Sequence, residues 1–175
     1  MINNTYVRLF VFVLLLLISI FTTGYSSESD ITSNTIKKIF QKNLPEETIY
    51  TEVPRGLIIS LDESILFKEC ETGIKKSALY ILDNIAEALK GLPNYCVIEN
   101  HIGTVCDETI ANWELAMVRS ANISEYFTKY NKIPHEQLFD IGYGEFMPID
   151  ETLNPKTKNL TNRIDFVIIN YDTKR

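Results

Sequence analysis

The residues best suited to chemistry lie in the stretch from Asn112 to Ala121, where an arginine follows an asparagine at helical spacing. Read as a helix, the stretch places Asn112 and Arg119 two turns apart on one face, beside the apolar Leu115 and Ala116. The planar guanidinium of Arg119 can pair with a carboxylate through two parallel hydrogen bonds. The stretch therefore predicts a site near a helix beginning; the alternative is a surface arginine on an amphipathic helix.

Other reactive residue types form no complete site in the sequence. Cys96, His101 and Cys106 could be metal ligands, but their spacing on a strand and a loop matches no common zinc pattern. A nucleophile formed by Cys106 and His101 lacks an orienting third group and an oxyanion hole. Paired catalytic carboxylates, a phosphate-binding glycine loop and a Ser-His-Asp arrangement are not evident either. We therefore expect no metal, no cofactor and no enzymatic activity.

The composition is that of a globular protein with an acidic balance. The chain has 175 residues, of which 45% are hydrophobic and 23% charged, and its formal net charge is −6. This length predicts one domain with a leader or linker. The negative charge argues against an extended nucleic-acid surface, so we expect no nucleic-acid partner.

The elements that must position Arg119 begin after an apolar leader and a polar segment. Residues 1–24 contain an apolar run from Leu9 to Phe21, which predicts a signal peptide or an uncleaved N-terminal membrane anchor. Either alternative implies export to the periplasm, with the membrane contacted only through this segment. Residues 25–48 are polar and rich in serine, and we expect them to form a tether.

A domain over residues 49–172 is predicted from alternating strand and helix patterns. Helices are indicated by apolar residues three and four positions apart, and strands by β-branched and aromatic runs bounded by turn residues. The order is β-α-β-α-β-β, which favours an α+β two-layer sandwich with helices packed on one face of a mixed sheet. The expected strands are 49–53, 57–61, 95–102, 138–144 and 163–169, and the expected helices are 75–90 and 108–130.

Several short motifs occur in an order that is typical of one known family. Asn112–Ala121 is close to N-x-x-L-S-x-x-R-A, with Ala116 at the usual serine and Ser120 at the usual alanine. Further motifs are Val53-Pro54-Arg55-Gly56-Leu57 with Leu66-Phe67, Ile98-Glu99-Asn100-His101, Gly142-Tyr143-Gly144-Glu145 with Pro148, and Thr161-Asn162-Arg163-Ile164-Asp165. Residues 50–170 therefore resemble OmpA-like peptidoglycan-associating domains, including those of MotB-type stator proteins. The order and spacing of the motifs are more specific than any single motif.

The resemblance implies non-covalent binding of the peptidoglycan stem peptide through diaminopimelate, and attachment of an envelope component to the wall. The free end of diaminopimelate is a zwitterion, which requires a cation and an anion from the protein. Arg119 stands at the position of the family's carboxylate-binding arginine, with Asn112 beside it and with Leu115 and Arg163 shaping the pocket. Gly103 stands where the family has the aspartate that pairs with the ammonium group.

Two interpretations follow from the missing aspartate. Asp107 or Glu108 supplies a substitute anion, although Asp107 could instead cap the following helix. Alternatively, the ligand site is eroded, and the domain is a scaffold that binds proteins within an envelope complex. Gly103 is the residue that separates the two hypotheses.

The chain has three cysteines, so at least one thiol is unpaired in an exported protein. Cys70 follows the first long strand and Cys106 follows the second. If these strands run parallel, both loops lie at the same end of the sheet, which favours a Cys70–Cys106 disulfide. Cys96 begins the second strand, at the opposite end, and is expected to be a buried free thiol.

Overall fold

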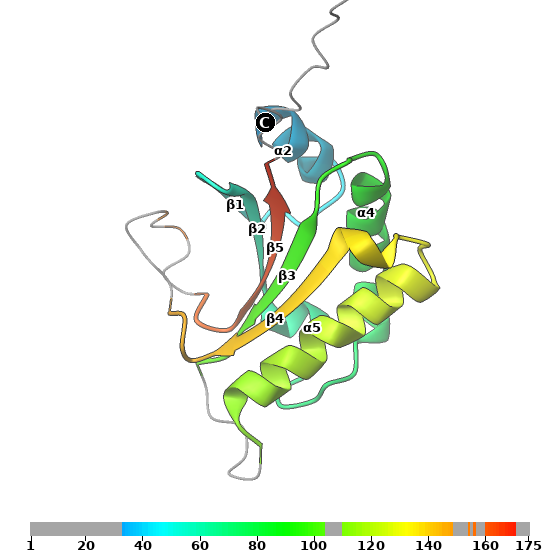
Figure 1. Cartoon of the computed structure of the whole chain (residues 1–175). Coiled ribbons are helices and arrows are strands. Elements are labelled where there is room, and N and C mark those ends of the chain that lie inside the picture. Colours follow the sequence, from blue (N-terminus) through cyan, green and yellow to red (C-terminus); the bar gives the residue numbers. More distant parts are fainter. Residues whose placement is uncertain (1–32, 104–109, 149–153, 155, 157–159, 171–175) are drawn as a thin grey trace, which may run out of the picture. The chain divides into compact units, whose positions relative to one another are not determined.

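The computed structural model describes residues 33–103, 110–148, 154, 156 and 160–170 (Figure 1). The chain alternates between strands, α-helices and two short 3-10 helices, η1 and η2. In order these are α2 (Ser33–Gln41), β1 (Ile49–Val53), β2 (Gly56–Asp62), α3 (Glu63–Leu66), η1 (Lys76–Ala78), α4 (Leu79–Lys90), β3 (Cys96–His101), α5 (Asn112–Lys129), η2 (His135–Gln137), β4 (Leu138–Gly144) and β5 (Arg163–Ile169).

The five strands form one mixed sheet in the order β1-β2-β5-β3-β4. The β3–β4 pair is parallel, and the β1–β2, β2–β5 and β3–β5 pairs are antiparallel. Because β2 and β3 both run antiparallel to β5, they run in the same direction and end at the same edge of the sheet. The α+β sandwich predicted from the sequence is confirmed, and the two long helices lie within the expected ranges 75–90 and 108–130.

Side chains of the central strands alternate between the helix-covered face of the sheet and the opposite face. Ile98 and Phe166 are paired across β3 and β5, and the ring of Phe166 lies 6.1 Å from that of Phe127 on α5. Burying a side chain of this size stabilises the fold by roughly 1.5–3 kcal/mol. Glu99 and Asp165 form the next pair along the same strands, so they point to the opposite face.

Helix α5 lies directly on β4 because two glycines and a serine remove bulk between them. A Cβ atom at Gly142 would lie 2.3 Å from the backbone nitrogen of Met117, and one at Gly144 would lie 2.6 Å from that of Trp113. Gly144 also has φ +54°, which favours glycine. The hydroxyl of Ser120 donates to a carbonyl of β4 at 3.1 Å. The Gly-Tyr-Gly motif therefore has a packing role.

The ordered unit begins earlier than the sequence suggested. Residues 33–41 form helix α2, in which Ile36 and Phe40 are 0% and 1% exposed. Their burial places this part of the expected tether, 25–48, within the same compact unit as the sheet. No helix was predicted in this segment from the sequence. Helix α2 is stabilised mainly by the packing of its two buried side chains, not by its own helix propensity.

The expected leader, residues 1–24, lies outside the described residues. Among the described helices, none combines the length and the apolar character needed to cross a membrane.

Candidate functional site

Arg119 is the largest fully buried side chain described, and its donors point at a loop that follows α3. It lies two turns into α5 and is 0% exposed. Its Nε donates to the carbonyl oxygen of Glu71 at 2.8 Å, and its Nη2 donates to that of Lys68 at 3.0 Å. The guanidinium carbon also lies 4.9 Å from the centre of the Phe67 ring. Arg119 is therefore a buried cation that holds the 68–71 segment.

The carboxylate that faces Arg119 belongs to Glu63, which the sequence did not single out. Nη1 of Arg119 lies 2.8 Å from Oε1 of Glu63. The contact is an ion pair rather than a well-aligned hydrogen bond, because Nη1 and the second carboxylate oxygen, Oε2, both lack hydrogen-bond partners among the described residues. Burial raises the pKa of Glu63, and the charge of Arg119 opposes that shift. This site therefore has a donor and an acceptor that are each incompletely satisfied.

Helix α3 explains how Glu63 reaches Arg119. Asp62 ends β2, and its side chain accepts a hydrogen bond from the backbone nitrogen of Ser64 at 2.8 Å, which caps the short helix. The turn then directs Glu63 into the protein. No helix was expected here from the sequence, although Asp62 is of a residue type that commonly caps a helix and stands just before an apolar run.

Gly103 lies at the same edge of the sheet as Glu63 and carries no anion. Its backbone nitrogen donates to the side-chain oxygen of Asn162 at 2.9 Å. The backbone nitrogen of Glu63 donates to the carbonyl oxygen of the same asparagine at 3.2 Å. A Cβ atom at Gly103 would lie 2.4 Å from the Thr161 side-chain methyl carbon. Asn162 therefore links Gly103 to the segment that supplies the partner of Arg119.

The other residues predicted on α5 are buried beside Arg119. Asn112 is 7% exposed and Leu115 is 1% exposed, and Leu115 packs in a small cluster with Ile102 and Ala116. This cluster joins the end of β3 to the first turns of α5.

The anions proposed to replace the missing aspartate, Asp107 and Glu108, lie outside the described residues. Helix α5 begins at Asn112 with Ala111 in the N-cap position, and the Glu114 side chain accepts from the Ala111 nitrogen at 3.2 Å. The capping role considered for Asp107 is therefore filled by other residues.

Arg163 is not brought together with Arg119. It starts β5 and pairs with Asp165, with Nε 2.9 Å from Oδ2. Asp165 occupies the face of the sheet that α5 does not cover, and Arg163 shares that face by alternation. The structure thus gives Arg163 a strand carboxylate as its partner, and its expected part in shaping the ligand pocket stays a prediction.

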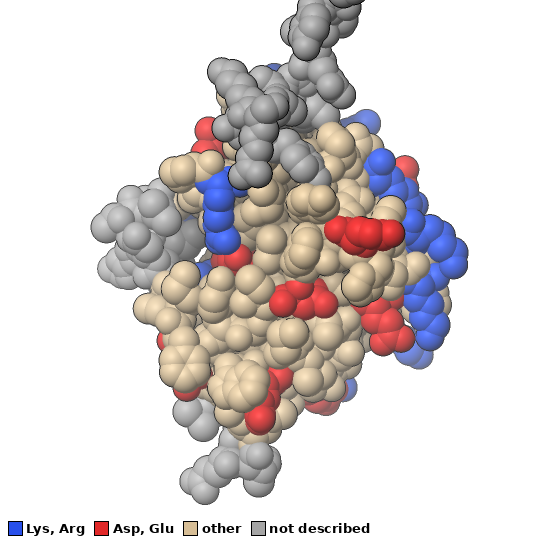
Figure 2. Space-filling view, viewed as in Figure 1, with Lys and Arg blue, Asp and Glu red and all other residues tan. Residues whose placement is uncertain are grey.

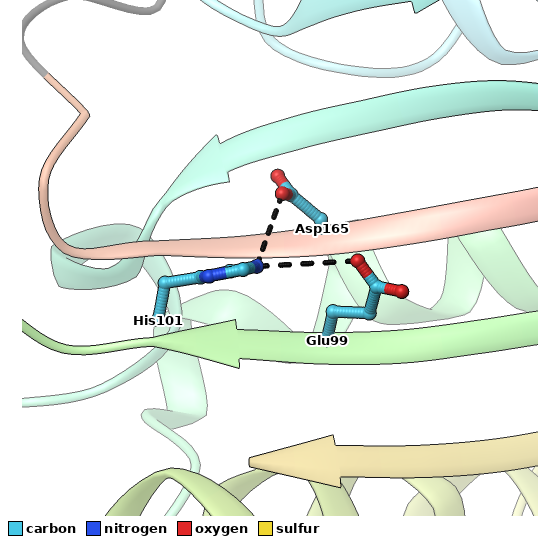
Figure 3. A group of neighbouring side chains, drawn as sticks. All are labelled: Glu99, His101 and Asp165. Atoms are coloured by element: carbon cyan, nitrogen blue, oxygen red, sulfur yellow. Dashed lines mark ion pairs between the residues drawn. The ribbon is translucent and has the colours of Figure 1, made fainter. Parts of the chain in front are cut away.

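A second group of buried charges surrounds Asp165 on that face (Figure 3). Nε2 of His101 lies 3.3 Å from Oδ2 of Asp165 and 4.0 Å from Oε2 of Glu99. Arg55 forms two hydrogen bonds to Glu99, at 2.7 and 3.0 Å. Burial raises the pKa of Asp165, but His101 and Arg163 outweigh burial and hold it below its ordinary value. Among the described residues, Glu99, His101 and Asp165 form the group that could hold a metal ion.

The cysteines show one disulfide-bonded and one free position. Cys70 is disulfide-bonded, and its predicted partner, Cys106, lies outside the described residues, so the pairing stays a prediction. Cys96 is a buried free thiol, as expected. Burial raises the pKa of that thiol, which makes it unreactive at neutral pH.

The surface near Arg119 has a basic hollow, whereas the face formed by β4 and α5 is mostly uncharged. The hollow has a volume of about 480 Å³, and its lining includes Lys68, Glu71, Lys75 and Lys76. Lys68 and Glu71 thus line the hollow and also supply the carbonyls that Arg119 binds. Figure 2 shows the β4–α5 side, where acidic side chains are scattered and basic side chains lie mainly along the right edge, with a smaller group left of centre.

Comparison with protein families matches residues 66–163 of this chain to the model described as the OmpA family. The chain is 29% identical over 117 residues to YtxE of Bacillus subtilis (strain 168), a match that covers 65% of this chain and 48% of that protein. It is 22% identical over 144 residues to Motility protein B of the same strain, covering 80% of this chain and 55% of that protein. The chain thus spans about half the length of the curated relatives it matches.

Among solved structures, the fold is similar to that of the cell wall anchor of the T6SS from Pseudomonas aeruginosa. The TM-score is 0.63 with 11% sequence identity, and the match covers 82% of this chain and 100% of that one. At this identity the similarity concerns the fold alone.

Proposed function

Because the chain belongs to the OmpA family, we propose that it associates non-covalently with peptidoglycan and links an envelope component to the cell wall. The proposed ligand is the stem peptide, contacted through the zwitterionic end of diaminopimelate. The role is one of attachment, not catalysis. A solved protein of similar fold is described as a cell wall anchor, which supports this assignment.

The observation that carries the proposal is the incomplete pairing of Arg119. Its Nη1 faces a carboxylate at 2.8 Å without an aligned hydrogen bond, while Nε and Nη2 are fixed by loop carbonyls. In the proposed bound state, the ligand carboxylate takes the position of the Glu63 carboxylate. Since an arginine fork binds a carboxylate most strongly through two hydrogen bonds, this exchange gains the alignment that Glu63 lacks.

The ammonium group of the ligand needs an anion that Gly103 cannot supply. Asp107 or Glu108 is the candidate for this role, as the sequence suggested. The lysines that line the neighbouring hollow complement the further carboxylates of a stem peptide.

We place the domain in the periplasm or an equivalent wall-facing compartment, held near the membrane by residues 1–24 acting as an anchor or released after cleavage of a signal peptide. The disulfide-bonded Cys70 supports an oxidising compartment. A domain that binds peptidoglycan has to lie on the same side of the membrane as the cell wall.

A second function, a scaffold with an eroded ligand site, is favoured by a specific observation. Arg119 is 0% exposed and already has a buried counter-ion, and the position of the family aspartate is Gly103. A ligand has to open this pair, whereas a protein-interaction role requires no such opening. In this alternative, the domain binds proteins of an envelope complex.

Sedimentation of the purified full-length chain with peptidoglycan sacculi separates the two functions. The natural sequence is compared with Arg119→Lys, which keeps the charge but loses the planar fork, and with Gly103→Asp. Retention that Arg119→Lys reduces at least about tenfold supports binding through the arginine fork. No retention of the natural sequence, with a gain in Gly103→Asp, supports the eroded site.

Two controls make the comparison specific. Gly103→Ala adds the same Cβ atom beside the Thr161 methyl as Gly103→Asp, but no carboxylate. A gain that both variants share reflects a local shift rather than a restored anion. Circular dichroism of each variant confirms that differences in retention do not arise from unfolding.

A further inference from the structure

The buried group on the face of the sheet opposite α5 has a geometry that the proposed wall-binding role does not use. Glu99, His101 and Asp165 are 2%, 3% and 4% exposed, and one ligand atom from each lies within 4.8 Å of the others. Figure 3 shows Nε2 of His101 pointing at both carboxylates. Three atoms with lone pairs therefore converge at one buried point.

The other ring nitrogen of His101 fixes what Nε2 can offer. Nδ1 lies 3.0 Å from the carbonyl oxygen of Met147, which can only accept, so Nδ1 carries the hydrogen. With Nδ1 protonated, Nε2 either carries a second proton towards Oδ2 of Asp165, 3.3 Å away, or presents a lone pair that an ion can take. The Asp165 carboxylate is also buried, opposite Ser60 on β2, whose side chain hydrogen-bonds to it. Lone pairs that face one another in a buried position require a cation between them.

We propose that Glu99, His101 and Asp165 bind a divalent transition-metal ion, and that Zn²⁺ suits this ligand set. One imidazole nitrogen with two carboxylate oxygens is a donor set that zinc accepts, whereas Mg²⁺ and Ca²⁺ prefer oxygen ligands alone. The separation of 3.3 Å between Nε2 and Oδ2 is compatible with a shared ion at about 2.0–2.2 Å from each atom. Glu99 completes the set from the same strand as His101.

The surroundings of His101 are those of an oriented metal ligand. A ligating histidine commonly donates its second ring N–H to a carbonyl, as Nδ1 does here to Met147. The ring of Tyr143 stacks on that of His101, with centroids 5.0 Å apart and an interplanar angle of 24°. These contacts hold the imidazole in place before an ion arrives.

Two arginines already contact the carboxylates of Glu99 and Asp165. Both carboxylates still have lone-pair positions that could bind a metal ion. A carboxylate has about four lone-pair positions, so Glu99 can bind Arg55 and an ion through different positions. The Arg55 side chain is 45% exposed, which lets it move towards solvent as an ion enters. Arg163 contacts Oδ2 of Asp165 through Nε alone, which leaves further lone-pair positions on that carboxylate. The arginine charges weaken binding, but they do not fill the ligand positions.

The test is thermal unfolding of the purified, chelator-treated full-length chain with Zn²⁺ or with Mg²⁺. At about a hundredfold excess of free Zn²⁺ over its Kd, we expect Tm to rise by roughly 5–10 °C, with no rise in Mg²⁺. His101→Ala and Asp165→Asn should remove the zinc-dependent rise. The absence of a zinc-dependent rise in the natural sequence would overturn the proposal and leave a proton on Nε2 as the cation between these groups.

The chain offers a matched control because it has two histidines. His135→Ala should keep the full response to zinc. A response that His135→Ala removes, or one that persists in His101→Ala, assigns the ion to another place and overturns the proposal.

If both variants at the site fail to fold, nitrogen NMR of the natural protein gives the answer. The His101 signals are assigned by their persistence in His135→Ala. A large zinc-dependent shift of the Nε2 signal, with Nδ1 little changed, is the expected result. Unchanged ring signals contradict the assignment without any variant at the site. This result does not depend on whether the chain binds peptidoglycan.

Discussion

Two groups of buried charges on opposite sides of the sheet are balanced in different ways. On the helix-covered side, Arg119 faces one carboxylate and two carbonyls, and the helix that carries it is fixed against β4. On the face opposite α5, two carboxylates and a histidine converge, and each carboxylate has one arginine. The first group can exchange its anion for a ligand carboxylate, whereas the second group has room for a cation. The charge of the incompletely paired group in each site therefore indicates whether that site can take an anion or a cation.

The largest expected effect is the loss of the Arg119 side chain. Arg119→Ala leaves Glu63 buried without its cation and frees the carbonyls of the 68–71 segment, so we expect a loss of about 3–5 kcal/mol in the free energy of unfolding. Urea denaturation measures this loss. Lys129→Ala, which breaks an exposed pair with Glu125 on the same helix, should change stability by no more than about 0.5 kcal/mol. Equal effects of the two variants would show that Arg119 is not a buried organising charge.

A smaller effect is expected from the second group, because its charges are shared among more partners. Asp165→Asn leaves Arg163 and His101 without their anion but keeps a polar group in place. We expect a loss of about 2–3 kcal/mol in the free energy of unfolding, again by urea denaturation. Glu125→Gln is the exposed control. A loss as large as that of Arg119→Ala would remove the contrast between the two groups.

The Arg55–Glu99 pair should contribute less, because Arg55 lies partly in solvent. Its side chain is 45% exposed, so screening reduces the value of two well-formed hydrogen bonds. We expect Arg55→Ala to cost about 1 kcal/mol, and a double-mutant cycle with Glu99→Gln measures the coupling. A coupling near that of a fully buried pair would contradict the idea that Arg55 can move aside for an ion.

The two groups should also respond to acid in opposite directions. Burial raises the pKa of Glu63, so the folded state takes up its proton first, and this group favours folding as pH falls towards the ordinary value of 4.5. That contribution is lost as pH rises through the folded pKa.

The contribution of Asp165 to stability changes with pH in the opposite direction to that of Glu63. Its pKa is held below the ordinary value of 3.8, so its contribution is present above that value and is lost as pH falls through the folded pKa. Tm measured between pH 7 and pH 3 should therefore fall less steeply in acid for Asp165→Asn than for the natural chain, and more steeply for Glu63→Gln. Parallel profiles for the two variants would contradict this account.

The fold was largely predictable from the sequence, because its strands and long helices carry clear periodicity and its glycine motifs mark close packing. Gly142 and Gly144 were recognised by their spacing, and the structure explains them by the approach of α5. Helix α2 was not predictable, because its two buried residues are stabilised by contacts with distant elements. The local sequence pattern does not reveal contacts with elements that are distant in the sequence.

The candidate site was predictable only in part. Arg119 was identified, but its counter-ion was not, because Glu63 reaches it through a short turn and a long separation in sequence. Glu99 and Asp165 were likewise seen as separate motif positions, and the antiparallel pairing of β3 with β5 places them side by side. Sequence motifs located residues that matter, while the sheet register determined which of them meet.

The most direct test of the exchange at Arg119 is calorimetric titration of a diaminopimelate-containing muropeptide into the natural chain and Glu63→Gln. If the ligand carboxylate has to displace that of Glu63, the variant should bind about tenfold more tightly, since a charge-assisted contact of about 1.4 kcal/mol no longer competes. Arg119→Lys should abolish binding in both backgrounds. Equal or weaker affinity in Glu63→Gln, or binding that survives Arg119→Lys, would contradict the claim that Glu63 holds the place of the ligand.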